Sequence, residues 1–272
     1  MNTAEFDYLK TMLYERSGLV VTPEKGYLIE SRLMPIARHR GIENVGRLIE
    51  EIRRTRDETA LAQIVDAMTT NETLFFRDGW PFERLRSNLL PEIMEKTKAS
   101  RRIRIWSAAC SSGQEPYSLA MIMAELGSAL AGWQVEIVAT DISDEMLARA
   151  QTGRYSVFEV SRGLSEPLLQ KYFEPEKDGW RAKDSLRSMI SFRRYNLLDD
   201  PAANGLGPFD IIFCRNVLIY FDETTRRRVF SGLAKVMRPW GYLCLGGAET
   251  VVGISDAFQV LTGERGLFGL KS

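Results

Sequence analysis

The chain has 272 residues, 44% of them hydrophobic and 26% charged, and its 36 basic and 36 acidic residues give a formal net charge of zero. This composition is typical of one large or two small globular domains, and the balanced charge predicts no whole-chain attraction to nucleic acid or to an anionic membrane. No run of about 18 apolar residues is present, so we expect no membrane insertion.

Histidine and cysteine are scarce, which restricts the possible chemistry. The single histidine, His39, excludes a histidine-rich metal site and argues against a Ser-His-Asp or Cys-His catalyst. Cys110, Cys214 and Cys244 lie far apart and fit no zinc spacing, so we expect no metal. Isolated thiols suit a reducing compartment and the first residues do not resemble a signal peptide, so we expect a cytoplasmic protein.

Residues 1–90 are predicted to form an all-helical N-terminal domain, because apolar residues recur there at helical spacing. Ser17 and Gly18 are expected to end the first helix, and Pro23 to stand where the next one begins. A polar and then aromatic segment, 69–77, precedes a last helix expected around 81–96. The apolar stripes of the first four helices are Phe6, Leu9, Leu13 and Tyr14; Leu28, Ile29, Leu33, Ile36 and Ala37; Val45, Leu48, Ile49 and Ile52; and Leu61, Ile64, Val65 and Met68.

Strand and helix patterns alternate from Ile103 onward, which predicts a parallel α/β sheet in a second domain, residues 91–272. Two short alternating pieces, 179–182 and 189–193, predict a small antiparallel insertion over about 153–193. The expected strands are 103–107, 135–140, 190–195, 209–214 and 241–246, and the expected helices are 116–130, 143–150, 165–173 and 223–237.

The turn Ala108–Gly113 consists of small residues between a strand and a helix. Small residues allow a ligand to approach the backbone closely, and the following helix N-terminus presents free N–H groups. The turn is not G-x-G-x-x-G, so an adenosine-containing ligand smaller than a dinucleotide is expected; a tight loop without a ligand is the alternative. Glu115 at the helix start either interacts with the helix dipole or accepts from a ligand ammonium.

Asp141 ends the next strand, where an acid can bind both hydroxyls of a ribose. Asp141 would also suit a helix N-cap, but Ser143 competes for that position and leads a sequence resembling a capping box. We therefore expect Asp141 to bind a ligand.

Polar residues also follow two other strands. Cys214, Arg215 and Asn216 end an apolar run, at the edge where open α/β sheets bind ligands; an ion pair of Arg215 with an acid such as Asp210 is the alternative. Asn196 ends the strand 190–195 and is either a ligand contact or a turn residue. The segment 69–77 is expected either to cross this edge as a lid or to end a helix over a core contact.

Four motifs in this chain closely resemble those of the chemotaxis receptor glutamate methyltransferases, the CheR family. The resemblance covers nearly the whole chain in order, and four motifs this long at compatible spacing are specific. They are Met-Thr-Thr-Asn-Glu-Thr-Leu-Phe-Phe-Arg at 68–77, Trp-Ser-Ala-Ala-Cys-Ser-Ser-Gly-Gln-Glu-Pro-Tyr-Ser at 106–118, Ala-Thr-Asp-Ile at 139–142 and Phe-Cys-Arg-Asn-Val-Leu-Ile-Tyr-Phe at 213–221.

The resemblance implies an all-α N-terminal domain joined to a Rossmann-like methyltransferase domain with a small β-subdomain. The implied methyl donor is S-adenosylmethionine, which becomes S-adenosylhomocysteine. The implied acceptors are glutamate side chains on the cytoplasmic helices of methyl-accepting chemotaxis receptors, which become methyl esters during adaptation. The enzyme would be recruited to membrane receptor arrays, and in some members the β-subdomain also binds a receptor tail peptide.

The resemblance also assigns roles to individual residues. Arg77 and Tyr220 would lie near the incoming glutamate as the catalytic pair. Glu115 would approach the methionine part of the donor, Asp141 its ribose, and Asn196 with Leu197 its adenine. The complete implied set of cofactor contacts is Asn71, Thr73, Arg77, Ala109, Gly113, Glu115, Asp141, Asn196, Leu197, Cys214, Arg215 and Asn216.

Acceptor choice is expected to come from the helical domain. Lys25, Arg32 and His39 recur every seven residues on one helical stripe, with Arg38 and Arg40 beside them. This basic stripe would dock on acidic receptor helices, and a solvated helix face is the alternative. The chain departs from the family at 246–249, where it reads Gly-Gly-Ala-Glu and the family often shows Gly-His-Ser-Glu. The missing histidine argues against a required role for it.

The predicted chemistry needs no histidine, because a glutamate with an ordinary pKa of about 4.3 is already an ionised nucleophile at neutral pH. The enzyme would position and partly desolvate the reactants. Two other functions remain open: a module that senses the nucleoside without turnover, and a methyltransferase for small molecules or RNA. RNA is disfavoured by the zero net charge.

Overall fold

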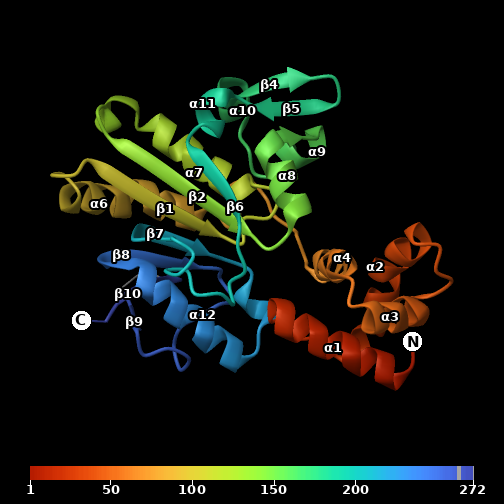
Figure 1. The fold of residues 1–272 in the computed structure, drawn as a ribbon. Helices are drawn as coiled ribbons and strands as arrows, with labels where there is room; N and C mark the ends of the chain where they lie inside the picture. The colour runs from red at the N-terminus through yellow and green to blue at the C-terminus, as the bar shows by residue number, and fades with distance from the viewer. Residues whose placement is uncertain (262–264, 272) are drawn as a thin grey trace. The chain divides into compact units, whose positions relative to one another are not determined.

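The computed structural model describes residues 1–261 and 265–271, which form two compact units. The first unit contains Met1–Thr70 with Tyr220–Thr225, and the second contains Asn71–Ile219 with Arg226–Ser272. Figure 1 shows helices in the first unit and a twisted sheet with helices in the second.

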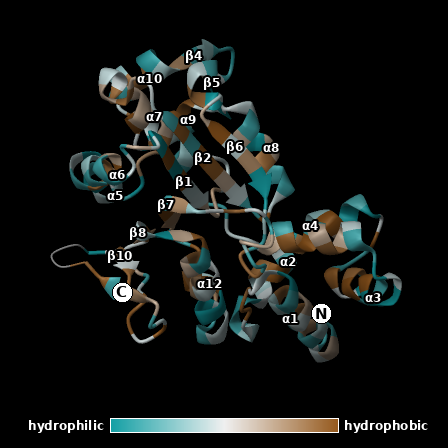
Figure 2. Cartoon of the chain, turned by 60° about the vertical axis from the view of Figure 1, so that its left-hand side comes forward, coloured by the Kyte–Doolittle hydropathy of each residue, from teal (hydrophilic) through white to brown (hydrophobic). Residues whose placement is uncertain are grey.

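The first unit is built from four helices whose buried residues include most members of the predicted apolar stripes. Tyr14, which was expected in the first stripe, is instead 37% exposed. The helices are α1 Thr3–Ser17, α2 Gly26–His39, α3 Val45–Thr55 and α4 Glu58–Met68, and the turn η1 Pro23–Lys25 precedes α2. Gly18 ends α1 with a φ of 73°, as expected, and its N–H donates to the carbonyl of Tyr14 at 2.8 Å. Figure 2 shows hydrophobic and hydrophilic residues together on these helices. Buried side chains at their contact include Leu9, Leu13, Ile29, Leu33, Leu48, Ile52, Leu61 and Ile64.

The second unit contains a seven-stranded sheet in the order β6-β2-β1-β7-β8-β10-β9. The first five strands of this order are parallel, and β10 and β9 add antiparallel pairs at one edge. The chain leaves β1 toward β2 on one side and later returns to β7 on the other, so the gap between β1 and β7 is a topological switch point. The strands are β1 Arg102–Ala108, β2 Gln134–Asp141, β6 Ile190–Arg194, β7 Phe209–Cys214, β8 Met237–Leu245, β9 Phe258–Val260 and β10 Leu267–Leu270.

Helices connect the parallel strands close to their predicted positions. The predicted helix 116–130 ends earlier, at Glu125, because Gly127 with a φ of 43° begins a separate turn. The connecting elements are α7 Gln114–Glu125, η3 Gly127–Leu130, α8 Asp144–Thr152, α9 Val157–Ser161, α10 Glu166–Tyr172, α11 Asp184–Arg187, η4 Leu218–Tyr220 and α12 Glu223–Val236.

The predicted antiparallel insertion is present but ends earlier than expected. Its three strands are β3 Arg154–Tyr155, β4 Phe173–Glu176 and β5 Gly179–Ala182, in the order β3-β5-β4. The second alternating piece, 189–193, does not belong to it. That piece is part of β6, which pairs parallel with β2 in the main sheet from Ile190 opposite Ile137. Alternation alone predicts a strand but not the sheet in which it pairs.

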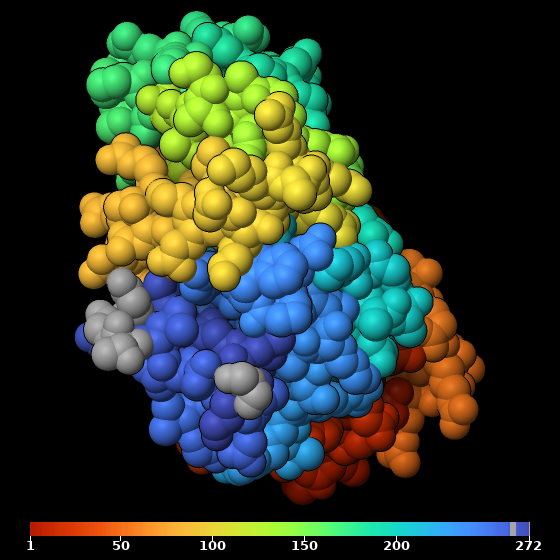
Figure 3. All heavy atoms as spheres, turned by 90° about the vertical axis from the view of Figure 1, so that its left-hand side faces the viewer, coloured from red at the N-terminus to blue at the C-terminus, as the bar shows by residue number. Residues whose placement is uncertain are grey.

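The helical segment before β1 belongs to the second unit, whereas the sequence pattern placed the boundary near residue 90. It consists of α5 Trp80–Arg84, the π-helical turn η2 Leu85–Leu89 and α6 Leu90–Lys96. Phe82 and Ile93 are buried in the same core as Ile105 and Phe213. In Figure 3 the orange and yellow spheres of this segment lie next to blue spheres of the C-terminal part, where the hydroxyl of Tyr242 donates to Glu92.

Phe75→Ala should lower the free energy of unfolding by about 3–5 kcal/mol, because the change leaves a cavity among aromatic rings. Phe75 is 1% exposed, and its ring centroid lies 4.9 Å from that of Tyr155 and 5.7 Å from that of Phe173. Denaturant titration measures the effect. Phe158→Ala is the control, since Phe158 is 67% exposed, and it should change stability by less than about 0.5 kcal/mol. Equal losses in the two variants would contradict the core position of Phe75.

Candidate functional site

The turn after β1 has an unusual backbone for residues other than glycine. Ala109 and Ser111 have φ values of 61° and 49°, in the left-handed region, and the N–H of Cys110 donates to the carbonyl of Thr140 at 2.9 Å. Gly113 has a φ of 95°, and a Cβ there would lie 2.9 Å from the Cβ of Ala150. A glycine is therefore needed at position 113 so that the turn can pack closely against α8. This packing explains the glycine without the predicted ligand contact.

Asp141 ends β2 beside this turn and is joined to it directly. Its two carboxylate oxygens accept the backbone N–H of Ser111 at 2.7 Å and that of Ser143 at 3.0 Å. Ser143 caps α8 by accepting from the N–H of Met146 at 3.1 Å, so the predicted cap at Ser143 is confirmed. Burial raises the pKa of Asp141, and the backbone hydrogen bonds partly oppose that shift. Lone pairs remain on both oxygens, since a carboxylate offers roughly four acceptor sites.

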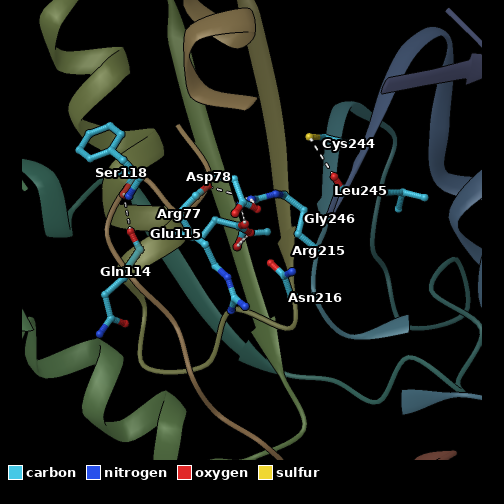
Figure 4. A network of polar contacts seen from close by, with 12 residues as sticks. Arg77, Asp78, Gln114, Glu115, Ser118, Arg215, Asn216, Cys244, Leu245 and Gly246 are labelled. Carbon is cyan, nitrogen blue, oxygen red and sulfur yellow. Dashed lines mark hydrogen bonds and ion pairs between the residues drawn. The ribbon is translucent and has the colours of Figure 1, made fainter. Parts of the chain in front are cut away.

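A buried ion-pair network lies at the ends of β1 and β7. The guanidinium of Arg215 donates to Glu115 at 3.0 Å and to Asp78 at 2.7 Å, and Glu115 also accepts from the hydroxyl of Ser107 at 2.7 Å. Figure 4 shows Arg215 between the two acids, with Asn216 and Gly246 close by. The side chain of Arg215 is only 2% exposed, so both acids neutralise a charge that water does not reach.

The alternative of an ion pair for Arg215 is confirmed, but Asp210 is not its partner. Asp210 lies in β7 and accepts from the backbone N–H of Arg104 at 2.8 Å, and it pairs with Arg238 at 3.1 Å. The acids that do pair with Arg215 come from other segments, which sequence proximity could not indicate.

Residues 71–79 are attached to this edge of the sheet by backbone contacts. The carbonyl of Asn71 accepts from the hydroxyl of Ser111 at 2.8 Å, and the carbonyl of Arg77 accepts from Arg215 at 2.8 Å. The N–H of Phe76 donates to the hydroxyl of Ser118 in α7 at 3.0 Å. The contacts therefore bring the segment that was expected to form a lid to the carboxyl ends of β1 and β7.

Backbone strain is concentrated at this edge. In the described part of the chain, seven residues other than glycine have positive φ, and five of them lie in the segments just described or directly after β7. Such conformations are unfavourable and persist where surrounding contacts hold them, which is common at functional sites. The five are Phe76, Asp78, Ala109, Ser111 and Asn216.

The predicted cofactor contacts differ in accessibility. Asn71, Thr73, Arg77, Ala109, Leu197 and Asn216 are half-buried, so part of each is exposed to solvent. Cys214 is fully buried, and burial raises the pKa of its thiol well above the ordinary value, so it is a neutral core residue with no exposed atom for a ligand. The side chain of Asn196 accepts from the N–H of Leu198 at 3.0 Å, which is the predicted turn alternative.

Glu249 is the residue at this edge that sequence reasoning missed. Its carboxylate accepts four backbone N–H groups, those of Asn216, Val217 and Leu218 after β7 and that of Gly246 after β8. In the Gly-Gly-Ala-Glu stretch at 246–249, only the absence of the family's histidine was used for a prediction. A glutamate three residues after a strand-ending glycine was the available signal.

The residues expected to dock a receptor do not form one exposed stripe. Lys25, Arg38 and His39 are exposed. Arg32 is not a freely solvated residue, because its guanidinium donates to the carbonyls of Met68 and Thr69 at 2.8 and 2.9 Å. A cation at these carbonyls stabilises the C-terminus of α4, so the structure gives Arg32 a local role.

Tyr220, the other predicted catalytic residue, ends the turn η4.

In the described part of the chain, no helix combines the length and apolar character needed to cross a bilayer. Among the same residues, no three or more histidine, cysteine, aspartate or glutamate side chains are grouped so as to hold a metal ion.

Residues 71–267 match the family model described as CheR methyltransferase, SAM binding domain, and residues 4–69 match the CheR methyltransferase all-alpha domain. The chain is 42% identical over 269 residues to chemotaxis protein methyltransferase Cher2 of Pseudomonas putida, covering 97% of this chain and 96% of that protein. It is 43% identical over 270 residues to chemotaxis protein methyltransferase 1 of Pseudomonas aeruginosa, with the same coverage. A chemotaxis protein methyltransferase of Vibrio parahaemolyticus is 40% identical over 266 residues, covering 97% of this chain and 95% of that protein.

Arg215→Ala should lower the free energy of unfolding by about 3–5 kcal/mol, because it leaves Glu115 buried without its counter-charge. Arg154→Ala is the matched control, since Arg154 pairs with Glu176 at the surface with its side chain 61% exposed. That pair should contribute at most about 1 kcal/mol. Chemical denaturation of both variants measures the difference. A loss in Arg215→Ala no larger than in the control would show that the network does not stabilise the fold.

Proposed function

We propose, because this chain belongs to the CheR methyltransferase family, that it methylates glutamate side chains of chemoreceptors. The chain is an S-adenosylmethionine-dependent methyltransferase of chemotaxis. The products of the proposed reaction are glutamyl methyl esters and S-adenosylhomocysteine. The observation that carries this proposal is Asp141, a buried carboxylate at the tip of β2 that is hydrogen-bonded to the strained turn after β1.

The residues at this edge fit the cofactor. Asp141 accepts backbone N–H groups on both of its oxygens, and its remaining acceptor capacity would serve the ribose hydroxyls. Asn196 and Leu197 follow β6 and would flank the adenine. Glu115 would face the methionine part near the start of α7, with its charge balanced by Arg215. When bound, S-adenosylmethionine supplies a methyl group on an electrophilic sulfonium sulfur.

The attached segment 71–79 supports a lid role for its exposed side chains. Asn71, Thr73 and Arg77 are half-buried there, while Phe75 anchors the segment in the core. One guanidinium nitrogen of Arg77 donates to the carbonyl of Glu72 at 2.9 Å. Such an arrangement would exclude water from the donor while leaving other Arg77 donors for the acceptor carboxylate.

The acceptor needs orientation rather than deprotonation. A glutamate side chain with an ordinary pKa of about 4.3 is ionised at neutral pH, so no general base is required. Arg77 would pair with the incoming carboxylate and Tyr220 would donate a hydrogen bond to it. The gain comes from holding one carboxylate oxygen in line with the bond that breaks.

Receptor recognition is assigned to exposed charges of the helical unit. Lys25 and Arg38 are exposed on and just before α2 and would attract acidic receptor helices, which recruits the enzyme to receptor arrays. Arg32 is not proposed to contact the receptor, because its guanidinium already donates to carbonyls at the end of α4. A receptor tail peptide would add as a further strand to an edge of the β3-β5-β4 sheet.

Asp141→Ala should weaken binding of S-adenosylhomocysteine about 10-fold or more, since hydrogen bonds to a charged group contribute about 1.5–3 kcal/mol. Isothermal titration calorimetry measures this affinity. An affinity within twofold of the natural chain would remove Asp141 from the ribose site.

The same titration has a pH dependence. Burial raises the pKa of Asp141, so acid should weaken binding at a higher pH than for an ordinary aspartate, and Asp141→Ala should lack this step. Protonation of Asp141 does not itself unfold the protein, because an acid with a raised folded-state pKa binds protons more tightly in the folded state. A flat profile in the natural chain would contradict the assignment.

Incubation of the full chain with methyl-labelled S-adenosylmethionine and chemoreceptor-bearing membranes should place base-labile label on the receptors. Lys25→Glu and Arg38→Glu should lower the initial rate severalfold and leave S-adenosylhomocysteine binding unchanged. Arg54→Glu, at an exposed position of α3, is the control and should keep the rate.

The outcomes separate the proposed function from its alternatives. Cofactor binding without transfer would support a nucleoside sensor. Label on RNA or on a small molecule, and none on the receptors, would support another kind of methyltransferase. Equal rates in the charge-reversal variants and the control would overturn only the docking role.

A further inference from the structure

We propose that Glu249 is a positioning residue for methyl transfer, which acts by holding the backbone between the cofactor side and the acceptor side of the site. The inference rests on the proposed function for its kinetic consequence. It rests on the geometry of the second unit for the interaction itself.

The carboxylate of Glu249 is fully used by backbone donors. Oε2 accepts the N–H of Asn216 at 2.8 Å and that of Gly246 at 2.7 Å. Oε1 accepts the N–H of Val217 at 2.9 Å and that of Leu218 at 2.7 Å. A carboxylate has roughly four acceptor sites, so Glu249 has none left for a substrate. Its role is therefore to orient other residues rather than to touch the reactants.

The backbone that Glu249 holds has an uncommon conformation. Asn216 has a φ of 59°, in the left-handed region, which is unfavourable for most residues other than glycine and costs asparagine less than most. Two of the four bonded N–H groups, those of Asn216 and Val217, lie on either side of the Cα atom of Asn216. The carboxylate thus selects one backbone geometry from those open to the loop.

Gly246 makes room for this carboxylate. A Cβ on Gly246 would lie 2.7 Å from Oε2 of Glu249 and 2.8 Å from the side-chain nitrogen of Asn216. No side chain fits there, so the glycine directly after β8 and the glutamate three residues later work together. The turn between them is closed by the N–H of Glu249, which donates to the carbonyl of Gly246 at 2.9 Å.

The held segment joins two parts of the proposed site along the chain. On one side it continues from Arg215, which belongs to the buried network with Glu115. On the other side it leads into the turn η4, which begins at Leu218 and ends at Tyr220, the residue proposed to orient the acceptor. Loss of the Glu249 contacts should therefore disturb the alignment of the acceptor with the donor more than it disturbs donor binding.

Glutamine should not replace Glu249, although it has the same size. An amide has one oxygen and one nitrogen, and the nitrogen would face two N–H donors that now bond to a carboxylate oxygen. Glu249→Gln is therefore a minimal change that removes two of the four acceptor contacts. The matched control is Glu136→Gln, which removes an acid bonded to Arg104 at 2.8 Å near the opposite end of β2.

The test uses the full chain, S-adenosylhomocysteine and chemoreceptor-bearing membranes. Glu249→Gln should reduce kcat at least 10-fold relative to Glu136→Gln, with the Kd for S-adenosylhomocysteine changed less than threefold. Thermal melting of both variants shows whether a general loss of stability explains the difference. A kcat equal to that of the control, or a Kd that rises in proportion to the lost kcat, would overturn the proposal.

Amide hydrogen exchange gives a readout that needs no turnover. In the natural chain the amides of 216–218 should be protected, and in Glu249→Gln their exchange should accelerate at least 10-fold. If this variant does not fold, the natural chain still decides, because exchange at 216–218 as fast as in an exposed loop would contradict the proposal. Receptor methylation by the natural chain is measured first, so a failure of the proposed function is recognised separately.

Discussion

The buried guanidinium of Arg215 is the contact on which the site depends. It connects three segments that are far apart in the sequence: the end of β7, the start of α7 through Glu115, and the segment 71–79 through Asp78 and the carbonyl of Arg77. Burying the charges of Arg215 and Glu115 has a large desolvation cost, which direct hydrogen bonds must offset, whereas the side chain of Asp78 is 40% exposed. In return, the network fixes the position of the segment 71–79 at the carboxyl ends of β1 and β7.

The site also depends on two carboxylates that accept hydrogen bonds from backbone N–H groups. Asp141 holds the turn after β1, and Glu249 holds the loop after β7. Both loops contain left-handed residues that are unfavourable by themselves. A site of this kind is preorganised, so binding of the cofactor and acceptor need not order the loops at the moment of reaction.

Local chemistry explains what the sequence could predict. The left-handed end of α1 at Gly18, the cap at Ser143 and the strand end at Asp141 follow from near neighbours, and the fold class follows from the alternation of strands and helices. Long-range partners could not be predicted in this way. Glu115 and Asp78 lie 100 and 137 residues from Arg215, and the three donors to Glu249 at 216–218 lie 31 to 33 residues from it. The helices at 80–96 have the apolar spacing of any amphipathic helix. That spacing would be the same in either unit, so it could not show which of the two cores they join.

The central claim is that the carboxyl edge of β1, β2 and β7 binds S-adenosylmethionine and presents its methyl group to a receptor glutamate. A crystal structure of the chain with S-adenosylhomocysteine tests it most directly. The account predicts both ribose hydroxyls on the Asp141 carboxylate, the adenine beside Leu197 and the sulfur open toward Arg77. A ligand bound elsewhere, or a ribose without contact to Asp141, would contradict it.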